Sequence, residues 1–441
     1  MNAAQKRGKR SAKENADLLI VNANELVTVE GGSQKPRTGA QMRELGIIRN
    51  GSLAVKDGKI VAVGKTAEVT KVFKAENIIN ANGKTVLPGF VDAHTHLVFA
   101  GSREDEFQMR VEGASYMEIL GAGGGILRTV RETRKASVEK LGDLTIERLD
   151  VMLEHGTTTV EAKSGYGLTT KDELKILEVV QRANQLHAMD VVPTFLGAHA
   201  IPLEYQGSPL GYVGLVVDEM IPKVAEKGLA EFCDVFCEKG VFGLEQTRRI
   251  LSAGKNFGLK PKVHADEMSQ LGGAELAAEF GAVSADHLLF STDEVLRAMA
   301  DKGVVAVLLP AAAFCLMNGR FADARVMINF GVPVALGTDY SPSCMVENMQ
   351  LVIAFTCHFM RLAPAEAITA ATINAAHALG RANDVGSLEV GKRADVVVLD
   401  APNHKFLGYH FGVNLVDKVV KNGRIVVDKE ASPSGIVHLE E

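Results

Sequence analysis

The fold depends on the stretch Leu87-Pro-Gly-Phe-Val-Asp-Ala-His-Thr-His96, in which a turn and an apolar strand lead directly into two histidines. Side chains at positions i and i+2 of a strand point to the same face, so His94 and His96 can reach one metal ion together. Two histidines at this spacing also arise by chance, with one capping a helix and the other in solvent. The rest of the chain decides between these interpretations.

The middle of the chain, residues 89–380, alternates short apolar, β-rich runs with stretches typical of helices. Such alternation is typical of βαβ units and a parallel sheet. The predicted strands lie at residues 89–94, 157–162, 190–195, 231–236, 260–264, 282–287, 304–309 and 332–336. Eight units of this kind predict an α/β fold whose strands close into a (β/α)₈ barrel of the TIM type.

Several predicted strands end in a polar side chain, and in such a barrel the carboxyl ends of the strands surround the active site. Three imidazoles and one carboxylate suit one divalent cation, Zn²⁺ or Fe²⁺, and leave a position for water. The predicted metal ligands are His94, His96, His264 and Asp339. A carbamylated Lys239 bridging two ions is the alternative, and the neighbouring Glu238 favours a single ion.

Two further side chains are candidates for proton transfer at this site. Glu267 stands three residues after His264, and His287 ends the next predicted strand, so both can face the ion without binding it. In a purely structural interpretation, Glu267 is a surface carboxylate and His287 is a hydrogen-bonded core histidine. Asp339 can accept the proton of an attacking water and pass it to the leaving nitrogen. We predict Asp339, Glu267 and His287 as the catalytic residues.

Both ends of the chain contain the signature of a β-hairpin. Asp57-Gly58 and Asn422-Gly423 each lie between two β-rich runs, and such pairs favour the positive φ angles of a two-residue turn. A lone hairpin is marginally stable in water, so residues 17–88 and 381–441 are expected to form one small sheet module together. Residues 1–16 are basic and polar and are expected to form a disordered tail.

The composition is that of a globular protein: 46% of the 441 residues are hydrophobic and 23% are charged. A formal net charge of −6 gives no electrostatic footprint for nucleic acid or an anionic membrane. No apolar run approaches the roughly 18–20 residues of a membrane span. The five cysteines have no regular spacing, which argues against a secreted disulfide framework. We expect a cytoplasmic protein whose partner is a small-molecule substrate.

These residues resemble the amidohydrolase superfamily and, more closely, the imidazolonepropionase family, which opens the imidazolone ring in histidine degradation. The His-x-His pair is shared across the superfamily, whereas longer signatures carry the closer resemblance. The signatures are Pro88–His96, Ala122–Ile126, Lys163–Leu168, Phe195–His199, His264–Glu267, Asp286–Leu288 and Tyr409–Asn414. The resemblance implies a (β/α)₈ barrel with a small β-sandwich made from both chain ends. It also implies hydrolysis of 4-imidazolone-5-propanoate to N-formimidoyl-L-glutamate, and a homodimer.

The resemblance further implies which residues contact the substrate. A guanidinium can hold a propanoate group through two parallel hydrogen bonds, and the matching residue is Arg103. The charge pattern alone would make Arg103 part of a surface ion pair within Ser102–Asp105. Tyr166, His199 and Glu267 match further contact positions. Without the resemblance, Tyr166 would be a loop aromatic and His199 a buried, hydrogen-bonded histidine.

One segment departs from the family pattern. After the metal-binding aspartate the family has Asn-Pro-Gly followed by Ser or Thr, whereas this chain has Ser341-Pro-Ser-Cys344. Ser341, Ser343 and Cys344 therefore stand at predicted substrate positions. Ser341 offers no amide, and Ser343 adds a side chain where glycine allows close backbone approach. The alternative function is that of another cyclic amidohydrolase or a deaminase acting on a related heterocycle. A non-catalytic scaffold is a remote alternative, which the presence of all four predicted ligands disfavours.

Overall fold

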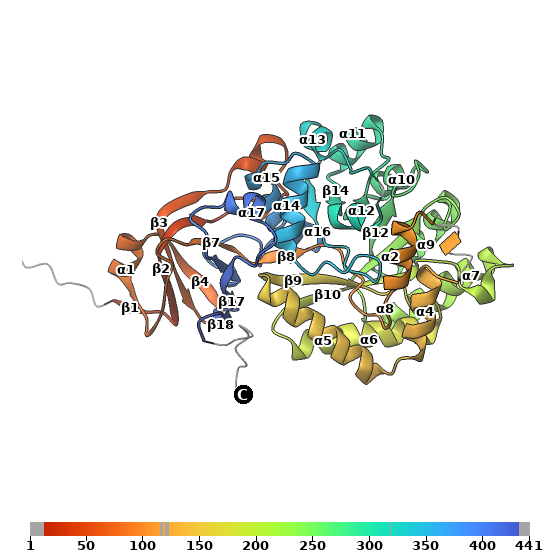
Figure 1. Ribbon diagram of the computed structural model, residues 1–441, viewed down its shortest axis with the longest axis horizontal. Helices are drawn as coiled ribbons and strands as arrows, with labels where there is room; N and C mark the ends of the chain where they lie inside the picture. The colour runs from red at the N-terminus through yellow and green to blue at the C-terminus, as the bar shows by residue number, and fades with distance from the viewer. Residues whose placement is uncertain (1–12, 115–117, 120–122, 318, 432–441) are drawn as a thin grey trace, which may run out of the picture.

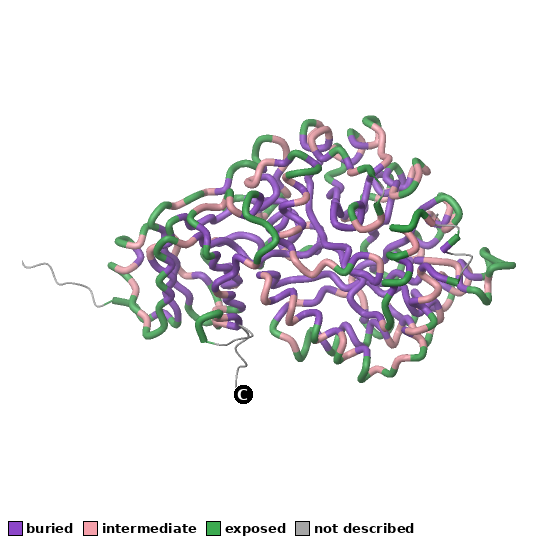
Figure 2. Tube along the Cα trace, in the orientation of Figure 1, coloured by how far each residue is buried: buried purple, intermediate pink, exposed green. Residues whose placement is uncertain are grey.

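The computed structural model describes residues 13–114, 118–119, 123–317 and 319–431. It has two lobes: a sheet built from both ends of the chain, and a barrel formed by the middle (Figure 1). In both lobes the strands are mostly buried, while exposed residues concentrate on the outer helices and loops (Figure 2). Gly121 and Ala122 of the glycine-rich stretch lie outside the described residues.

The barrel contains eight parallel strands whose spatial order follows their order in the chain. They are β8 (Phe90–Asp92), β9 (Thr157–Lys163), β10 (Asp190–Ala198), β11 (Phe232–Cys237), β12 (Lys260–Ala265), β13 (Ser284–His287), β14 (Val305–Leu308) and β15 (Val334–Leu336). Each coincides with one of the predicted strands, so the predicted α/β barrel is confirmed.

Helices follow the strands and cover the outside of the barrel, as right-handed βαβ crossovers require. The helices between β8 and β11 are α2 (Glu104–Val111), α4 (Ile126–Lys135), α5 (Val138–Glu154), α6 (Thr170–Leu186), η2 (Leu203–Tyr205), α7 (Pro209–Leu215), η3 (Val216–Met220) and α8 (Ile221–Glu226). Those between β11 and β15 are α9 (Leu244–Asn256), α10 (Gly273–Phe280), α11 (Asp293–Lys302), α12 (Pro310–Cys315) and α13 (Ala324–Asn329). After β15 come α14 (Met349–Phe359), α15 (Pro364–Ala370), α16 (Ile373–Ala378) and α17 (Phe406–Tyr409).

The barrel closes along a seam between the residues that follow β8 and those that follow β15. The backbone N–H of Asp339 donates to the carbonyl of His94 at 3.0 Å, and that of His96 donates to the carbonyl of Tyr340 at 2.9 Å. Gly337 permits this close approach, because a Cβ atom there would lie 2.8 Å from the Cβ of His94. The seam therefore fixes three of the four predicted metal ligands relative to one another.

The second lobe is an eight-stranded sheet with an apolar core of its own. Its strands are β2 (Leu18–Val27), β3 (Ile47–Lys56), β4 (Lys59–Lys65), β6 (Asn77–Asn80), β7 (Thr85–Pro88), β16 (Val396–Leu399), β17 (Val416–Lys421) and β18 (Arg424–Asp428). The N-terminal part also contains η1 (Gly39–Arg43), α1 (Thr66–Val72) and a two-stranded sheet of β1 (Glu14–Asn15) and β5 (Phe73–Lys74). β7 pairs with β16, so the predicted module made from both chain ends is confirmed.

Both predicted hairpins are confirmed, and their turns lie against each other. Asp57 and Asn422 have φ angles of 51° and 49°, and each is followed by a glycine that also has positive φ. A Cβ atom on Gly58 would lie 3.0 Å from the carbonyl oxygen of Asn422, and one on Gly423 would lie 3.1 Å from the Cα of Gly58. Glycine is therefore required at both turns for conformation and for space.

Four charged residues connect the two lobes, and we call them the inter-sheet clamp. Nζ of Lys421, at the end of β17, lies 2.6 Å from Oδ2 of Asp190 at the start of β10 and 2.6 Å from Oδ2 of Asp395. Arg393 contacts the same Asp190 oxygen at 2.6 Å. Burial alone would raise the pKa of Asp190, but Lys421 and Arg393 outweigh burial and lower it.

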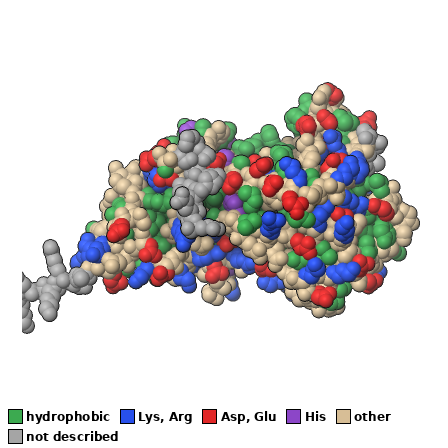
Figure 3. Space-filling view, turned by 90° about the horizontal axis from the view of Figure 1, so that it is seen from below, with side chains coloured by type: hydrophobic (Ala, Val, Ile, Leu, Met, Phe, Trp, Pro, Cys, Tyr) green, Lys and Arg blue, Asp and Glu red, His purple; other side chains and the backbone are tan. Residues whose placement is uncertain are grey.

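The predicted tail is shorter than expected. Glu14 and Asn15 form β1, and Ala16 is buried against Val69 and neighbouring apolar residues, because β5 offers a free edge there. Residues 1–12 lie outside the described residues. Within the described part of the chain, no helix has both the length and the hydropathy to cross a bilayer. On the face shown in Figure 3, basic and acidic side chains are interspersed over the barrel.

Candidate functional site

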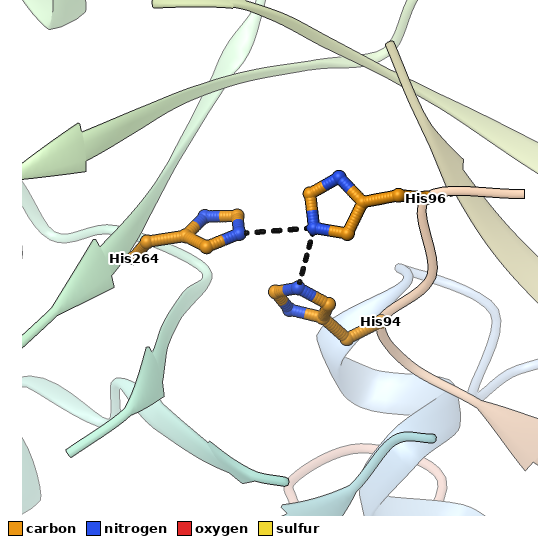
Figure 4. Close-up of side chains that lie close together, drawn as sticks. All are labelled: His94, His96 and His264. Atoms are coloured by element: carbon orange, nitrogen blue, oxygen red, sulfur yellow. Dashed lines mark hydrogen bonds between the residues drawn. The ribbon is translucent and has the colours of Figure 1, made fainter. Parts of the chain in front are cut away.

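The four predicted ligands, which are buried where the barrel strands end, are His94, His96, His264 and Asp339. Figure 4 draws the three histidines. Nε2 of His96 lies 3.3 Å from Nε2 of His94 and 3.4 Å from Nε2 of His264. Oδ1 of Asp339 lies 3.5 Å from Nε2 of His94 and equally far from Nε2 of His96. The three histidines thus have ring nitrogens within 4.8 Å of one another, and the carboxylate of Asp339 lies beside two of them.

These spacings fit a metal ion. A tetrahedral ion with bonds of about 2.0–2.1 Å keeps its ligand atoms about 3.4 Å apart. Hydrogen bonds among the three rings cannot satisfy all the facing nitrogens, because a neutral imidazole has one N–H and one lone pair. Burial is the main cause that lowers the pKa of each of the three histidines well below its ordinary value. The rings are therefore neutral and offer lone pairs, as metal binding requires.

Carboxylates orient two of the three histidines from behind. Nδ1 of His94 donates to Oδ2 of Asp286 at 2.6 Å. Nδ1 of His264 lies 3.0 Å from Oδ2 of Asp234, which is within ion-pair distance but off the line of a hydrogen bond. A proton held on Nδ1 leaves Nε2 as the nitrogen that can bind a metal.

His96 is held differently. Its Nδ1 is buried and has no hydrogen-bond partner among the described residues. Its ring stacks on His199, with the ring centroids 4.8 Å apart and the planes 15° from parallel. Packing, rather than a carboxylate, therefore orients this ligand.

A lysine lies behind both orienting carboxylates. Nζ of Lys163 is 2.7 Å from Oδ2 of Asp234, 3.3 Å from Oδ2 of Asp286 and 2.9 Å from Oε2 of Glu161. Burial alone would lower the pKa of Lys163, but these carboxylates outweigh burial and raise it, so the side chain is charged. A second fully buried lysine, Lys262, lies 2.7 Å from Oε1 of Glu161. In the sequence Lys163 is the first residue of a family signature, and no role was predicted for Asp234, Asp286, Glu161 or Lys262.

Close contacts between nitrogen and oxygen atoms link all these groups into what we call the ligand network: His94, His96, His264, Asp339, Asp286, Asp234, Glu161, Lys163 and Lys262. It contains four carboxylates but only two ammonium groups. Burial, followed by the nearby carboxylate of Glu267, raises the pKa of Asp339 well above its usual range. A divalent cation would make the network neutral, so the charge fits a metal ion as well as the spacing does.

A cavity of about 450 Å³ opens above the ligands. It is lined by the predicted residues His96, His264, Asp339, Glu267, His287, Arg103, Tyr166, His199, Ser341 and Ser343. The sequence also missed Glu106 and Arg110, which line the same cavity. Apolar walls come from Ile119, Ile126 and Phe236. The cavity has the size and the few convergent polar groups typical of a small-molecule site.

Arg103 lines the cavity and also forms an ion pair. Its Nε donates to Oε2 of the buried Glu106 at 2.8 Å, one turn further along α2. Oε1 of Glu106 accepts the backbone N–H of Gly125 at 2.9 Å, where α4 begins. Arg103 thus pairs with the buried Glu106 and not with an acidic residue of the surface segment Ser102–Asp105, and this ion pair fixes the guanidinium against the cavity.

The loop that carries Tyr166 is held by one buried carboxylate. Glu173, in the first turn of α6, accepts the backbone N–H groups of Gly165, Gly167 and Leu168 at 2.7–2.9 Å. Nδ1 of His199 lies 3.1 Å from the carbonyl oxygen of Gly165. Burial is the main cause that lowers the pKa of His199 to about 4, so this ring is neutral. Tyr166 and His199 are therefore positioned by the same short loop.

The proton-transfer candidates lie together, while one substrate position is placed differently. Nε2 of His287 lies 3.6 Å from Oε2 of Glu267, and both residues line the cavity. Ser341 and Ser343 contact each other through their hydroxyl groups at 3.2 Å. Cys344 is buried, with its thiol 3.5 Å from the carbonyl of Thr338, and it is not among the described residues that line the cavity. It packs under the loop because its backbone closes a tight turn with Ser341.

The backbone around the cavity is strained. Leu168, Asp266, His287, Leu288 and Asp339 all have φ between 52° and 76° although none is glycine. Such conformations cost about 1 kcal/mol or more each and cluster at functional sites. At Asp339 the barrel seam imposes the conformation, because the N–H of this residue is bonded to the carbonyl of His94. Lys239 is exposed, which does not support a bridging role for it.

Comparison with known proteins gives consistent results. A model described as the amidohydrolase family matches residues 255–426. The chain is 54% identical over 416 residues to the imidazolonepropionase of Alkaliphilus metalliredigens, with 94% of this chain and 98% of that protein covered. It is 55% identical over 415 residues to the imidazolonepropionase of a Geobacillus species, with 93% and 98% covered.

Two solved structures illustrate the likeness of fold. A zinc-bound adenosine deaminase from Xanthomonas campestris superposes with a TM-score of 0.74 at 21% identity, covering 97% of this chain and 96% of that one. The ochratoxinase of A. niger superposes with a TM-score of 0.67 at 19% identity, covering 96% and 98%. Identities this low establish the fold alone.

Proposed function

The chain belongs to the imidazolonepropionase family of amidohydrolases, and from this membership we propose that it hydrolyses 4-imidazolone-5-propanoate to N-formimidoyl-L-glutamate. One observation carries the proposal beyond family membership. A single cavity is lined both by Asp339, Glu267 and His287 and by Arg103 and other predicted substrate contacts. Hydrolysis of this substrate needs both groups of residues, one for the ring amide and one for the propanoate.

We infer that the cofactor is one divalent metal ion, Zn²⁺ or Fe²⁺, held by the predicted ligands His94, His96, His264 and Asp339. The convergent donor atoms and the negative excess of the ligand network support this inference. Such an ion, when bound, lowers the pKa of water toward neutrality and polarises a carbonyl group. The zinc-bound deaminase of the same fold is consistent with zinc.

The chain's own side chains move the protons of the reaction. Water adds to the carbonyl carbon of the ring amide, and one water proton passes to the carboxylate of Asp339. The carbon–nitrogen bond then breaks, and the proton is delivered to the departing ring nitrogen. The new carboxylate and the formimidoyl group remain in one open-chain product. Glu267 and His287, 3.6 Å apart, stand beside this path and complete the transfer between oxygen and nitrogen.

The remaining polar groups position the substrate. The guanidinium of Arg103, held by Glu106, binds the propanoate group. The hydroxyl of Tyr166 and the neutral ring of His199 contact the heterocycle from the side next to His96. The cavity walls exclude bulk water, which strengthens these polar contacts.

The Ser341 and Ser343 pair supports a second candidate, hydrolysis of a related cyclic amide or amidine. The two hydroxyl groups lie in the cavity where the family has an amide and a glycine. A substrate that presents a hydrogen-bond donor at that point would gain a partner, whereas one that needs the asparagine amide would lose one.

The setting of the enzyme follows from the same reasoning. We propose a homodimer in the cytoplasm, with residues 89–380 as the catalytic domain and residues 17–88 and 381–441 as the companion domain. Neither nucleic acid nor membrane is proposed as a partner, because the net charge is −6 and the predicted substrate is small.

The decisive experiment is to incubate the purified protein with freshly prepared 4-imidazolone-5-propanoate and to follow both substrate loss and product formation. Metal content is measured on the same sample, and Asp339→Ala is the control. Turnover that depends on bound metal supports the proposal. Absence of turnover by metal-loaded wild-type protein, together with hydrolysis of a related cyclic amide, would select the second candidate.

A further inference from the structure

Lys163 takes no part in the reaction described above, yet it lies at the centre of the ligand network. Its side chain is fully buried, and its Nζ contacts Oδ2 of Asp234 and Oδ2 of Asp286. The same two oxygen atoms contact Nδ1 of His264 and Nδ1 of His94 on their other side. Each oxygen thus lies between the ammonium group and one ligand imidazole. One lysine therefore connects two of the metal ligands.

We propose that Lys163 is a positioning residue that holds both carboxylate–histidine pairs and thereby sets the affinity of the protein for its metal. The proposal rests on the metal-dependent function proposed above. Without the ammonium, the buried carboxylates of Asp234 and Asp286 lose the cation that contacts both of them, and they repel each other. Both side chains then leave the positions from which they orient Nδ1 of His264 and Nδ1 of His94.

Register in the barrel explains why one lysine can reach both pairs. Glu161 and Lys163 are two residues apart on β9, as are Ser284 and Asp286 on β13, so each pair points to the same face. Asp234 comes from β11, which lies between these strands in the sheet order. Ser284 donates to the second oxygen of Asp286 at 2.6 Å and leaves Oδ2 to face the lysine.

The ammonium also occupies a place that would otherwise suit another cation. Ligand atoms of His94, Glu161 and Asp286 all lie within 4.8 Å of one another. Nζ of Lys163 lies among them, 2.9 Å and 3.3 Å from the two carboxylates. A positive charge attached to the chain thus fills this place, which favours a single metal ion per chain.

The other buried lysine provides a matched control. Lys262 is also fully buried in the barrel and contacts the same Glu161, on its other oxygen. Among the described residues, Lys262 forms its ion pair with Glu161 and contacts neither Asp234 nor Asp286. Replacing either lysine by methionine removes one buried charge from the same cluster. Only Lys163→Met removes the charge that contacts Asp234 and Asp286.

The experiment compares full-length wild type, Lys163→Met and Lys262→Met. Zinc affinity is measured by competition with a chromophoric chelator, and the visible absorption of the Co²⁺-loaded proteins reports on ligand geometry. We expect Lys163→Met to bind zinc about 10- to 100-fold more weakly and to change the cobalt spectrum, as loss of partners behind metal ligands generally does. Lys262→Met should lose clearly less zinc affinity than Lys163→Met, because its charge contacts neither carboxylate–histidine pair. Equal losses in both variants, or wild-type affinity in Lys163→Met, would overturn the proposal.

A second variant covers the case in which Lys163→Met does not fold. Asp286→Asn keeps the shape of the side chain but removes the charge that connects Lys163 to His94. It should weaken zinc binding to a similar degree, and zinc affinity equal to that of wild type would refute the proposal. Both readouts are metal binding rather than turnover. A protein that binds zinc as expected but does not hydrolyse the imidazolone would count only against the proposed function.

Discussion

The inter-sheet clamp and the ligand network both contain buried carboxylates and buried cations, but the two groups differ in net charge. In the inter-sheet clamp two carboxylates face two cations, and Lys421 lies 2.6 Å from both Asp190 and Asp395. In the ligand network four carboxylates face two ammonium groups, and Lys163 contacts three of those carboxylates. The clamp is neutral as it stands, whereas the ligand network becomes neutral only with a divalent cation. The net charge of a buried cluster therefore distinguishes a purely structural cluster from one that suits a bound cation.

The largest effect is expected from Asp339→Ala, which removes both a proposed metal ligand and the proposed proton acceptor. The catalytic rate should fall at least about a thousandfold, or about 4 kcal/mol in the barrier. Bound metal measured by elemental analysis should fall as well. Asp339→Asn is the control for shape, and it should restore part of the metal but little of the rate. Normal metal content with near-normal turnover in Asp339→Ala would show that the ligand network is not part of the active site.

Lys421→Met tests the balanced cluster. Breaking a buried ion pair leaves uncompensated charge, so the free energy of unfolding should fall by about 3–5 kcal/mol in denaturant titrations. Zinc affinity and kcat should stay at wild-type values under conditions in which the variant is folded, because the clamp lies away from the ligands. A loss of metal affinity as large as that in Lys163→Met would show that the two clusters are not independent.

Arg103→Ala sharpens the distinction between binding the metal and binding the substrate. Loss of the guanidinium should raise KM about 30- to 100-fold, equivalent to about 2–3 kcal/mol, with a smaller change in kcat and none in metal content. Arg103→Lys keeps the charge but not the paired geometry, so it should recover only part of the affinity. If Arg103→Ala instead lowered metal content with unchanged KM, the assigned role of Arg103 would be wrong.

Glu366 gives the smallest effect and a dependence on pH. Its carboxylate accepts hydrogen bonds from Arg325 at 2.6 Å, from Arg43 at 3.0 Å and from the backbone N–H of Ala363 at 2.7 Å. These contacts connect η1, α13 and α15. Burial alone would raise the pKa of Glu366, but these contacts outweigh burial and lower it to about 2. Because the pKa is depressed on folding, this contribution is complete above about pH 4.5 and is lost as the pH falls toward 2.

The measurement for Glu366 is the difference in unfolding free energy between wild type and Glu366→Gln as a function of pH. At pH 7 the variant should be less stable by about 1–2 kcal/mol. The difference should shrink between pH 4.5 and about 2. A difference that stays constant over this range would show that the charge of Glu366 contributes nothing.

The parts of the fold that depend on local pattern were predictable from the sequence. The eight barrel strands have apolar runs bounded by turns, and the turns at Asp57 and Asn422 need only two residues to specify. The four predicted ligands lie at the ends of three strands, β8, β12 and β15, so a closed barrel brings them together. For the same reason the cavity collects the predicted residues from distant parts of the chain.

The ligand network behind the histidines could not be derived in the same way. Glu161, Asp234 and Lys262 lie within strands, and a charge there is buried only when partners from other strands meet it. That meeting depends on the register of four strands, which no local pattern contains. A usable signal did exist. A charged residue inside a short apolar run, such as Asp234 in Phe232–Cys237, indicates a partner across the barrel.

The place of Cys344 also depended on more than pattern. The residues around it match the family in position, but the tight turn with Ser341 directs its thiol toward Thr338 and away from the cavity. This placement depends on the backbone hydrogen bonds of the turn, which the residue types alone do not specify.

The pairing of β7 with β16 bears on the order in which the molecule is made. On the ribosome, the strand that ends at Pro88 is complete long before its neighbour at Val396 exists. During that interval the growing chain carries an unpaired strand edge beside a partly formed apolar core, while the barrel is still being synthesised. The contact between the turns at Gly58 and Asn422 is then among the last to form. A ribosome that stops before the final strands therefore releases a chain whose first lobe is unfinished, although every residue of the catalytic cavity is already present.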